Sequence, residues 1–199
     1  MNVLCVLSEI GTGELTRCEP IFRWWREQGN PAPLLLSRQE VIESADCFPI
    51  EYHDIQSSGR VLFGEDLFAS MVIHDHDYRA QVEHEIRAKI LRLRQKAAGV
   101  MQDDPLLLRL MADSVSTFCV LLRHALVIAG EARSTQKRDI VARAAAKFGL
   151  VVEPLNALLD LREGKRKARE LKPVALLDQY LKELGRAAAA VNALDGKGE

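Results

Sequence analysis

Apolar residues divide the chain into a front third of short segments and a remainder of long helical stripes. The runs at residues 2–7 (NVLCVL) and 33–36 (PLLL) are short and almost wholly apolar, which is typical of buried strands. Between them, apolar residues three and four positions apart predict an amphipathic helix over 14–28, ended by a Gly-Asn-Pro turn. The alternation over 48–55 (FPIEYHDI) predicts a third strand.

Two local signals add detail to this front third. Ser37 and Glu40 have the spacing of a capping box, which predicts a short helix reaching about Ala45. Gly59 then ends the third strand before the apolar residues 61–63. The front third is therefore expected to be a small alternating arrangement of helices and strands.

From about Asp77 onward the apolar period becomes helical. An apolar stripe predicts one long helix, and Asp103-Asp104-Pro105 is a favourable start for a second helix over 106–129. That second helix is apolar nearly all round, so we expect it to be the central member of a bundle. A helix capped by Ser134 or Thr135 and ending at Gly149 is expected next. Two more helices are expected over 153–161 and 174–194.

Composition excludes several classes of protein. The chain has 199 residues, of which 48% are hydrophobic and 28% are charged, as in soluble globular proteins. Its longest uninterrupted apolar runs are far shorter than the roughly 20 residues that span a bilayer, and its first basic residue, Arg17, lies too late for a secretory signal. We therefore expect a cytoplasmic protein that does not cross a membrane. The four cysteines form no C-x-x-C pair, so we expect buried apolar thiols and neither a zinc ribbon nor a redox pair.

Charge is distributed unevenly along the chain. Residues 1–78 carry five basic and 13 acidic residues, a net charge of −8, whereas the remainder carries 22 basic and 15 acidic residues, a net charge of +7. Such an asymmetry indicates two units that attract one another or a basic surface for a polyanion, and it also arises from the solvated faces of ordinary helices.

The segment 46–68 (DCFPIEYHDIQSSGRVLFGEDLF) carries spaced acids and then a V-L-F-G run. It resembles the third-acid strand and the segment that follows it in nucleotidyltransferase-like proteins of the polymerase beta superfamily. Residues 83–95 and the long helices resemble the helical domain that follows this fold in predicted bacterial nucleotidyltransferases, and also kanamycin-nucleotidyltransferase-like and HEPN-like bundles. The resemblance covers about residues 1–165.

This resemblance implies a site in which three carboxylates hold two divalent cations that align a nucleotide triphosphate. Glu51 takes the place of the third acid, with Asp54 as the alternative. The family's Gly-Ser turn and D-x-D pair are not present ahead of Glu51. If residues 2–7 are the acid-bearing strand, Asn2 occupies the second acid's place and the first acid would precede Met1. We then expect either a start recorded too late or a degenerate remnant.

The metal ions of this family are held largely by the D-x-D acids, which are not present ahead of Glu51. Asn2 offers a metal ligand without charge, so Glu51 and Asn2 would be remnants of a metal site only. Mg²⁺ is expected only if an upstream segment restores the acidic residues, and otherwise no cofactor is expected. We predict that this chain does not transfer nucleotides.

Other motifs have simpler explanations. His74-Asp75-His76-Asp77 lacks the four-residue ligand spacing of a helical zinc site, and acids are favourable at a helix start. His124 is expected to be a core or interface histidine and not a catalyst. The nearest match to the R-x-x-x-x-H pattern of HEPN-type ribonucleases, Arg79 to His84, starts at the wrong helix, and Arg123-His124 has the wrong spacing. Trp25 fits a core position and Trp24 a partly exposed one, although both could stack on bases. The basic run 165–169 (KRKAR) is expected to face solvent, so nucleic acid is not an expected partner.

The sequence as a whole predicts an α+β protein. A truncated nucleotidyltransferase-like α/β unit over 1–73 is expected to pack on a helical bundle over 74–195, with a disordered tail over 196–199. Because the front unit has too few strands to close its own core, we expect a homodimer. The function expected first is that of a non-catalytic nucleotidyltransferase-superfamily protein with a residual nucleotide- or partner-binding cleft. The alternative is an antitoxin-like or scaffolding interaction module without nucleotide chemistry.

Overall fold

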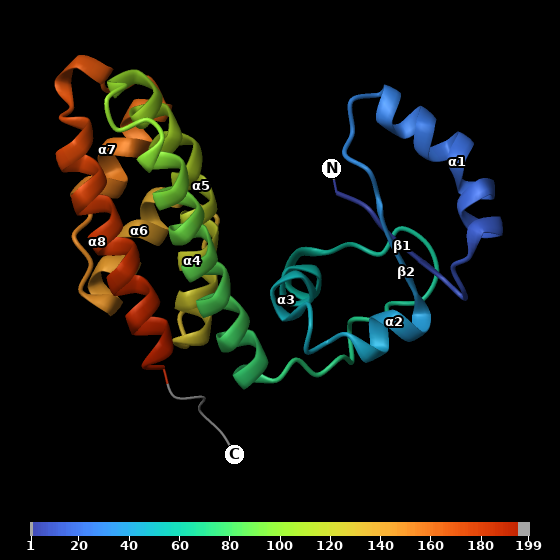
Figure 1. Cartoon of the computed structure of the whole chain (residues 1–199). Coiled ribbons are helices and arrows are strands. Elements are labelled where there is room, and N and C mark those ends of the chain that lie inside the picture. The colour runs from blue at the N-terminus through green and yellow to red at the C-terminus, as the bar shows by residue number, and fades with distance from the viewer. Residues whose placement is uncertain (1, 195–199) are drawn as a thin grey trace. The chain divides into compact units, whose positions relative to one another are not determined.

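The computed structural model describes residues 2–194 and divides the chain into two compact units, Met1–His74 (unit 1) and Asp75–Glu199 (unit 2) (Figure 1). The described chain is mostly helical and contains one small parallel sheet, which is an α+β composition. The tail predicted over 196–199 lies outside the described residues.

Unit 1 begins with a β-α-β arrangement. Strand β1 (Leu4–Leu7) pairs in parallel with β2 (Leu34–Ser37), and Leu4 is the register partner of Leu34. Helix α1 (Thr12–Glu27) connects the two strands, as parallel strands require a crossover. The first two predicted strands and the helix between them are confirmed, with β1 shorter than expected.

The third predicted strand is wrong, because residues 48–55 lie in a helix. Helix α3 (Pro49–Ser58) has its proline in the first turn, where the missing amide costs no hydrogen bond, and the Tyr52 amide donates to the Phe48 carbonyl at 3.0 Å. Pro49, Tyr52 and Ile55 lie three residues apart on the inner side of this helix. The apolar residues of this segment therefore follow the three-residue spacing of a helix and not the two-residue alternation of a strand. The described sheet has two strands.

Helix α2 (Arg38–Glu43) begins as predicted. The Glu40 amide donates to the Ser37 hydroxyl at 3.1 Å, and the Ser37 amide donates to the Glu40 carboxylate at 2.7 Å. This reciprocal pair satisfies two amides that the first turn would otherwise leave without a partner. The capping box is confirmed.

The core of unit 1 is small. Val41, Tyr52 and Phe68 form its buried centre, and the rings of Tyr52 and Phe68 meet edge to face at 5.1 Å. Alternate residues of the strands, Leu4, Val6 and Leu36 among them, pack against this centre only partly buried. Thus one face of the sheet is covered by α2, α3 and the segment that ends at Ile73.

Unit 2 is a bundle of five α-helices among the residues described (Figure 1). Helix α5 contacts each of the other four, so the prediction that the apolar helix is central is confirmed. The Asp103 carboxylate caps this helix by accepting from the Leu106 amide at 3.0 Å. The bounds are α4 (Asp75–Ala98), α5 (Asp104–Ile128), α6 (Lys137–Phe148), α7 (Glu153–Arg162), a short 3-10 turn (Ala168–Glu170) and α8 (Pro173–Asn192).

The helix ends in unit 2 differ slightly from the predicted ones. Helix α6 ends at Gly149, whose φ of 67° is the left-handed conformation that glycine adopts without strain. Its N-cap is Gln136 and not Ser134 or Thr135; the Ser134 hydroxyl accepts from the Gln136 amide at 3.3 Å and fixes the turn ahead of the helix.

Helix α5 also has the length and composition of a membrane-crossing helix, with a mean hydropathy of 1.6 over its best window. A core helix of a soluble protein has the same properties, and α5 is surrounded by α4, α6, α7 and α8. The structure is compatible with a soluble protein, and the cytoplasmic location stays a prediction.

Candidate functional site

The structure places Glu51, the predicted third acid, on a helix and not on the strand that the sequence suggested. Glu51 is exposed in the first turn of α3, and half-buried Asp54 follows three residues later on the same helix. Asn2 is exposed ahead of β1. The two-cation site implied by the resemblance takes its acids from neighbouring strands, so a helix-borne pair does not fit it. No step through magnesium follows from these residues.

A pocket of about 270 Å³ lies where β1 passes into α1, at residues that sequence reasoning did not select. It sits beyond the carboxyl end of a parallel strand, which is where ligands bind in open α/β sheets. The signal that could have indicated it is the G-T-G at residues 11–13, between a strand and a helix. The lining residues are Leu7, Ser8, Glu9, Glu14, Arg17 and Cys18.

The electrostatics of this pocket disfavour a phosphate. Hydrogen bonds from the backbone amides of Glu14 itself and Gly11, with a smaller effect of Arg17, hold the pKa of the Glu14 carboxyl below its usual value. The Gly11 amide donates to Glu14 Oε2 at 3.0 Å, and Arg17 forms an ion pair with the same side chain. The carboxylate of Glu14 thus occupies the positive end of α1 that an anion would need.

Helix α1 is the least packed helix of unit 1. It has no buried residue, and no other element of the described chain makes extensive contacts with it (Figure 1). Its inner side chains Cys18, Phe22 and Trp25 are only half-buried, so the prediction that Trp25 is a core residue is wrong. The Trp25 indole N–H donates to the Pro31 carbonyl at 2.8 Å and so ties the helix to the loop before β2.

Ile21 and Trp24 are the most exposed large apolar side chains of α1. Ile21 is 64% exposed and Trp24 is 56% exposed, which confirms the expectation for Trp24. The ring centroids of Trp24 and Trp25 are 6.4 Å apart, with the two rings tilted by 53° to each other. Other large apolar side chains of unit 1 are exposed as well: Leu15, Leu34, Ile42, Phe48, Val61, Leu62, Phe63 and Val72.

In the bundle, His124 is the core histidine that the sequence predicted. It is 2% exposed, its Nδ1 lies 2.7 Å from the Tyr78 hydroxyl, and its Nε2 lies 3.0 Å from a guanidinium nitrogen of Arg123. Because a guanidinium only donates, Nε2 accepts and the ring proton resides on Nδ1. A buried pair of this kind is a structural contact between α4 and α5 and not a site open to substrate.

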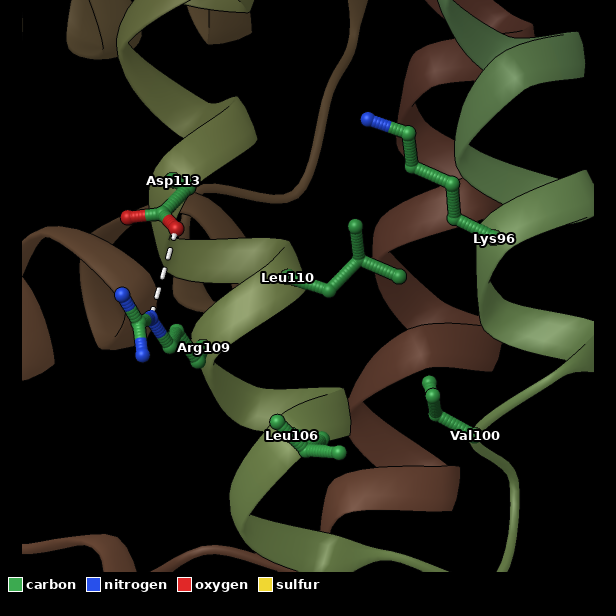
Figure 2. A pocket seen from close by; sticks show the side chains of 6 residues that line it. All are labelled: Lys96, Val100, Leu106, Arg109, Leu110 and Asp113. Atoms are coloured by element: carbon green, nitrogen blue, oxygen red, sulfur yellow. Dashed lines mark ion pairs between the residues drawn. The ribbon is translucent and has the colours of Figure 1, made fainter.

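A second pocket lies between α4 and α5 and has a volume of about 220 Å³. Figure 2 shows Leu110 pointing between the two helices, whereas Arg109 and Asp113 pair at 3.9 Å along the outer side of α5. Lys96, Val100 and Leu106 complete its lining. Like the pocket between β1 and α1, it is smaller than the roughly 300–1,000 Å³ of typical ligand sites, and its charged groups do not converge on one point.

The two remaining sequence motifs are the His-Asp run at 74–77 and the basic run at 165–169. His76 Nδ1 lies 3.3 Å from Asp77 Oδ1, and the described part of the chain has no group of three His, Cys, Asp or Glu residues that could hold a metal. In the basic run, Lys165 pairs with Glu163 at 2.7 Å and Arg166 with Glu153 at 3.0 Å. These contacts agree with a solvated surface segment.

The cysteines are less buried than predicted. Cys119 is buried in α5, where burial raises the pKa of its thiol to about 11. Cys5 and Cys18 are half-buried, and Cys47 is exposed. The expectation of buried thiols therefore holds for Cys119 and is wrong for Cys47.

Comparisons with protein-family models, with curated proteins and with solved structures give no match to the chain. The resemblance to nucleotidyltransferase-like proteins thus rests on segments of the sequence alone and stays a prediction. What the structure itself defines is an α+β chain with a small front unit and a well-packed helical bundle.

Proposed function

We propose that the chain is a protein-interaction module whose contact surface is the outer side of α1, without nucleotide chemistry. The observation that carries this proposal is that α1 has no buried residue while Ile21 and Trp24 project from it into solvent. We infer a protein-binding surface from these neighbouring apolar side chains, because burying them against a partner would remove apolar area from water.

The stability of α1 supports the same proposal. An isolated helix of 16 residues is marginal in water, and this one contains Pro20 in its interior, which costs a helix about 3 kcal/mol relative to alanine. Most helices offset such a cost by burying one face against the rest of the domain, but α1 has few such contacts within its own unit. A bound partner would supply the missing burial.

The rest of unit 1 is also poor in buried surface. Its buried centre consists of Val41, Tyr52 and Phe68, and chains of this size need additional contacts for stability because a small core buries little apolar area. The bundle contrasts with it, since α5 alone buries twelve residues. Unit 1 is therefore the part of the chain whose stability would increase most if a partner covered its exposed apolar side chains.

Photo-crosslinking tests this proposal. A photoreactive phenylalanine analogue at position 24 of the full chain, in the cells that produce it, is expected to give a discrete adduct with protein. The same analogue at Val174, which is 50% exposed on α8, is the matched control and is expected to give none. A chain that gives no protein adduct from position 24 contradicts the proposal.

A second candidate is a residual nucleotide-binding cleft in a nucleotidyltransferase-superfamily protein. It is favoured by the place of the pocket between β1 and α1, together with the sequence resemblance, and opposed by the Glu14 carboxylate in the same position. Thermal unfolding with ATP or CTP and magnesium tests it, since a ligand that binds only the folded state raises the melting temperature. If the nucleotide binds at this pocket, it is expected to raise the melting temperature, and to raise it more in Glu14→Gln than in the unchanged protein.

A further inference from the structure

We propose that Cys5 of β1 and Cys18 of α1 form a reversible disulfide when the chain meets a small disulfide such as oxidised glutathione. This inference goes beyond the proposed function and does not depend on it. The sequence contains no C-x-x-C motif, so local spacing predicted no redox pair. The fold instead brings two thiols that are 13 residues apart in the sequence to one face of the sheet.

Cys5 lies on the face of β1 that is turned away from the core of unit 1. Leu4 and Val6 of the same strand pack against the buried centre of that core. Because successive side chains of a strand point to opposite faces, Cys5 and Leu7 belong to the other face.

Helix α1 places Cys18 on this same face. Leu7 and Cys18 both line the pocket of about 270 Å³ between β1 and α1. Leu7 is two residues from Cys5, which is one full repeat of a strand, so Cys18 lies over the side of the sheet to which Cys5 points. Both cysteines are half-buried, and neither is in a disulfide.

The electrostatics of the two thiols agree with this placement. Burial is the main cause that raises the pKa of the Cys5 thiol, and charge repulsion from Cys18 raises this pKa further. Repulsion between two thiolates falls off with the distance between their sulfurs, so the two side chains are near neighbours.

The packing of α1 leaves room for the approach that a bridge requires. A disulfide holds its two Cα atoms about 4.4–6.8 Å apart. No residue of α1 is buried, and no other element of the described chain makes extensive contacts with the helix. A shift of α1 toward β1 therefore separates few packed side chains.

Two exchange steps form the bridge. The Cys18 thiolate meets the entering disulfide first, because its side chain lines the pocket. It attacks one sulfur, the S–S bond of the oxidised glutathione breaks, and one glutathione leaves as a thiolate. The Cys5 thiolate then attacks Cys18 Sγ in this mixed disulfide, and the second glutathione leaves. The two protons that the cysteines lose go to the departing thiolates, so two protein thiols are oxidised and one oxidised glutathione is reduced to two thiols.

The bridge would connect the least packed helix of unit 1 to its sheet by a covalent bond. Such a link removes conformations from the unfolded chain and restricts α1 in the folded chain. The oxidised chain is therefore expected to melt at a higher temperature than the reduced chain. In a reducing compartment a bond of this kind is transient, as in cysteines that sense oxidants.

Peptide mapping of the full chain tests the inference. Cys47→Ser removes the exposed thiol, and this chain is incubated in its folded state with oxidised and reduced glutathione. Remaining thiols are then blocked and the chain is digested with trypsin, which cleaves after Arg17 and Arg23. The expected product joins peptide 1–17 to peptide 18–23 and separates into the two on reduction. Cys5→Ser in the same background is the matched variant and is expected to keep one glutathione on Cys18.

A comparison with the unfolded chain separates a site of the folded state from chance pairing. At the same glutathione ratio, the ratio of linked to reduced chain is expected to be about tenfold or more greater in the folded protein than in urea, because folding holds the thiols together. An equal ratio in the two states would overturn the inference. So would a folded chain in which each cysteine carries its own glutathione, in which neither reacts, or in which the links join two chains. None of these outcomes alters the adduct expected from position 24, which tests the proposed function separately.

Discussion

The hydroxyl of Tyr78 and Nδ1 of His124 lie 2.7 Å apart inside the helical bundle, although 46 residues separate them in the sequence. Their rings meet edge to face, and both side chains are 2% exposed. The pair joins the first turn of α4 to the second half of α5 by a buried polar contact.

Tyr78→Phe is expected to lower the free energy of unfolding of the full chain. The substitution removes the hydroxyl that lies 2.7 Å from Nδ1 of the buried His124, and the loss of a buried hydrogen bond costs about 1 kcal/mol. Urea denaturation followed by circular dichroism measures the change. His84→Gln, at an exposed position of α4, is the control and is expected to leave stability unchanged. Equal stability of Tyr78→Phe and the unchanged protein would show that the contact contributes nothing.

Gly149→Ala is expected to destabilise the bundle by about 1–2 kcal/mol, because an alanine at a φ of 67° has its Cβ too close to the carbonyl oxygen. Gly185→Ala is the matched control in unit 2. Its added methyl group meets no atom within 4 Å in the middle of α8, and the change is expected to stabilise by about 0.5–1 kcal/mol. The denaturation midpoint is expected to fall in Gly149→Ala and to rise in Gly185→Ala. A rise in both variants would contradict the assigned conformation of Gly149.

Asp103→Ala is expected to cost about 1 kcal/mol, because the Leu106 amide loses the carboxylate that caps the central helix. Gln102→Ala, one residue earlier and outside the cap, is the control. The measurement is the free energy of unfolding in urea. A loss no larger than that of Gln102→Ala would mean that solvent replaces the cap at no cost.

Glu163 is expected to titrate far below an ordinary glutamate. The hydrogen bond from Lys165, followed by that from Arg138, lowers the pKa of its carboxyl from 4.5 to about 2. Since the folded-state pKa is depressed, the contribution of this carboxylate to stability is present above pH 4.5 and is lost as pH falls toward 2. Carboxyl-carbon NMR is the measurement, and Arg138→Gln is expected to shift the midpoint upward. A midpoint near 4.5 in the unchanged protein would exclude the pairing.

Nucleotide transfer is expected to be undetectable for this chain. Glu51 lies exposed in the first turn of α3, and Asp54 lies on the same helix, whereas the family's acids lie on neighbouring strands. An assay with radiolabelled nucleotides and magnesium is the measurement, with Glu51→Gln as the matched variant. Turnover that Glu51→Gln abolishes would contradict this expectation and restore the nucleotidyltransferase hypothesis.

Much of the secondary structure could be predicted from local patterns. The capping box at Ser37 and Glu40, the cap at Asp103 and the end of α6 at Gly149 depend on neighbouring residues only, and the structure confirms each of them. The bundle was predictable for a similar reason, since a helix as apolar as α5 has to be surrounded by others.

The segment 48–55 was predicted wrongly, and with it the placement of Glu51. Its short sequence fits alternation with period two and also fits apolar positions at Pro49, Tyr52 and Ile55. Pro49 favours a helix start, and as a helix the segment buries Tyr52 against Val41 and Phe68, a contact that the local sequence pattern does not reveal.

The sequence by itself determined several helix ends, such as the caps at Ser37 and Asp103 and the end at Gly149. It also determined which helix is central in the bundle and that His124 would lie in a core or an interface. Those features depend on hydrogen bonds and apolar spacing within a few turns of the chain. Tertiary structure alone decided that residues 48–55 are helical, that the pocket lies between β1 and α1, and that α1 leaves Ile21 and Trp24 exposed. The physical reason is that burial is shared among segments distant in sequence, so it is settled only when those segments meet.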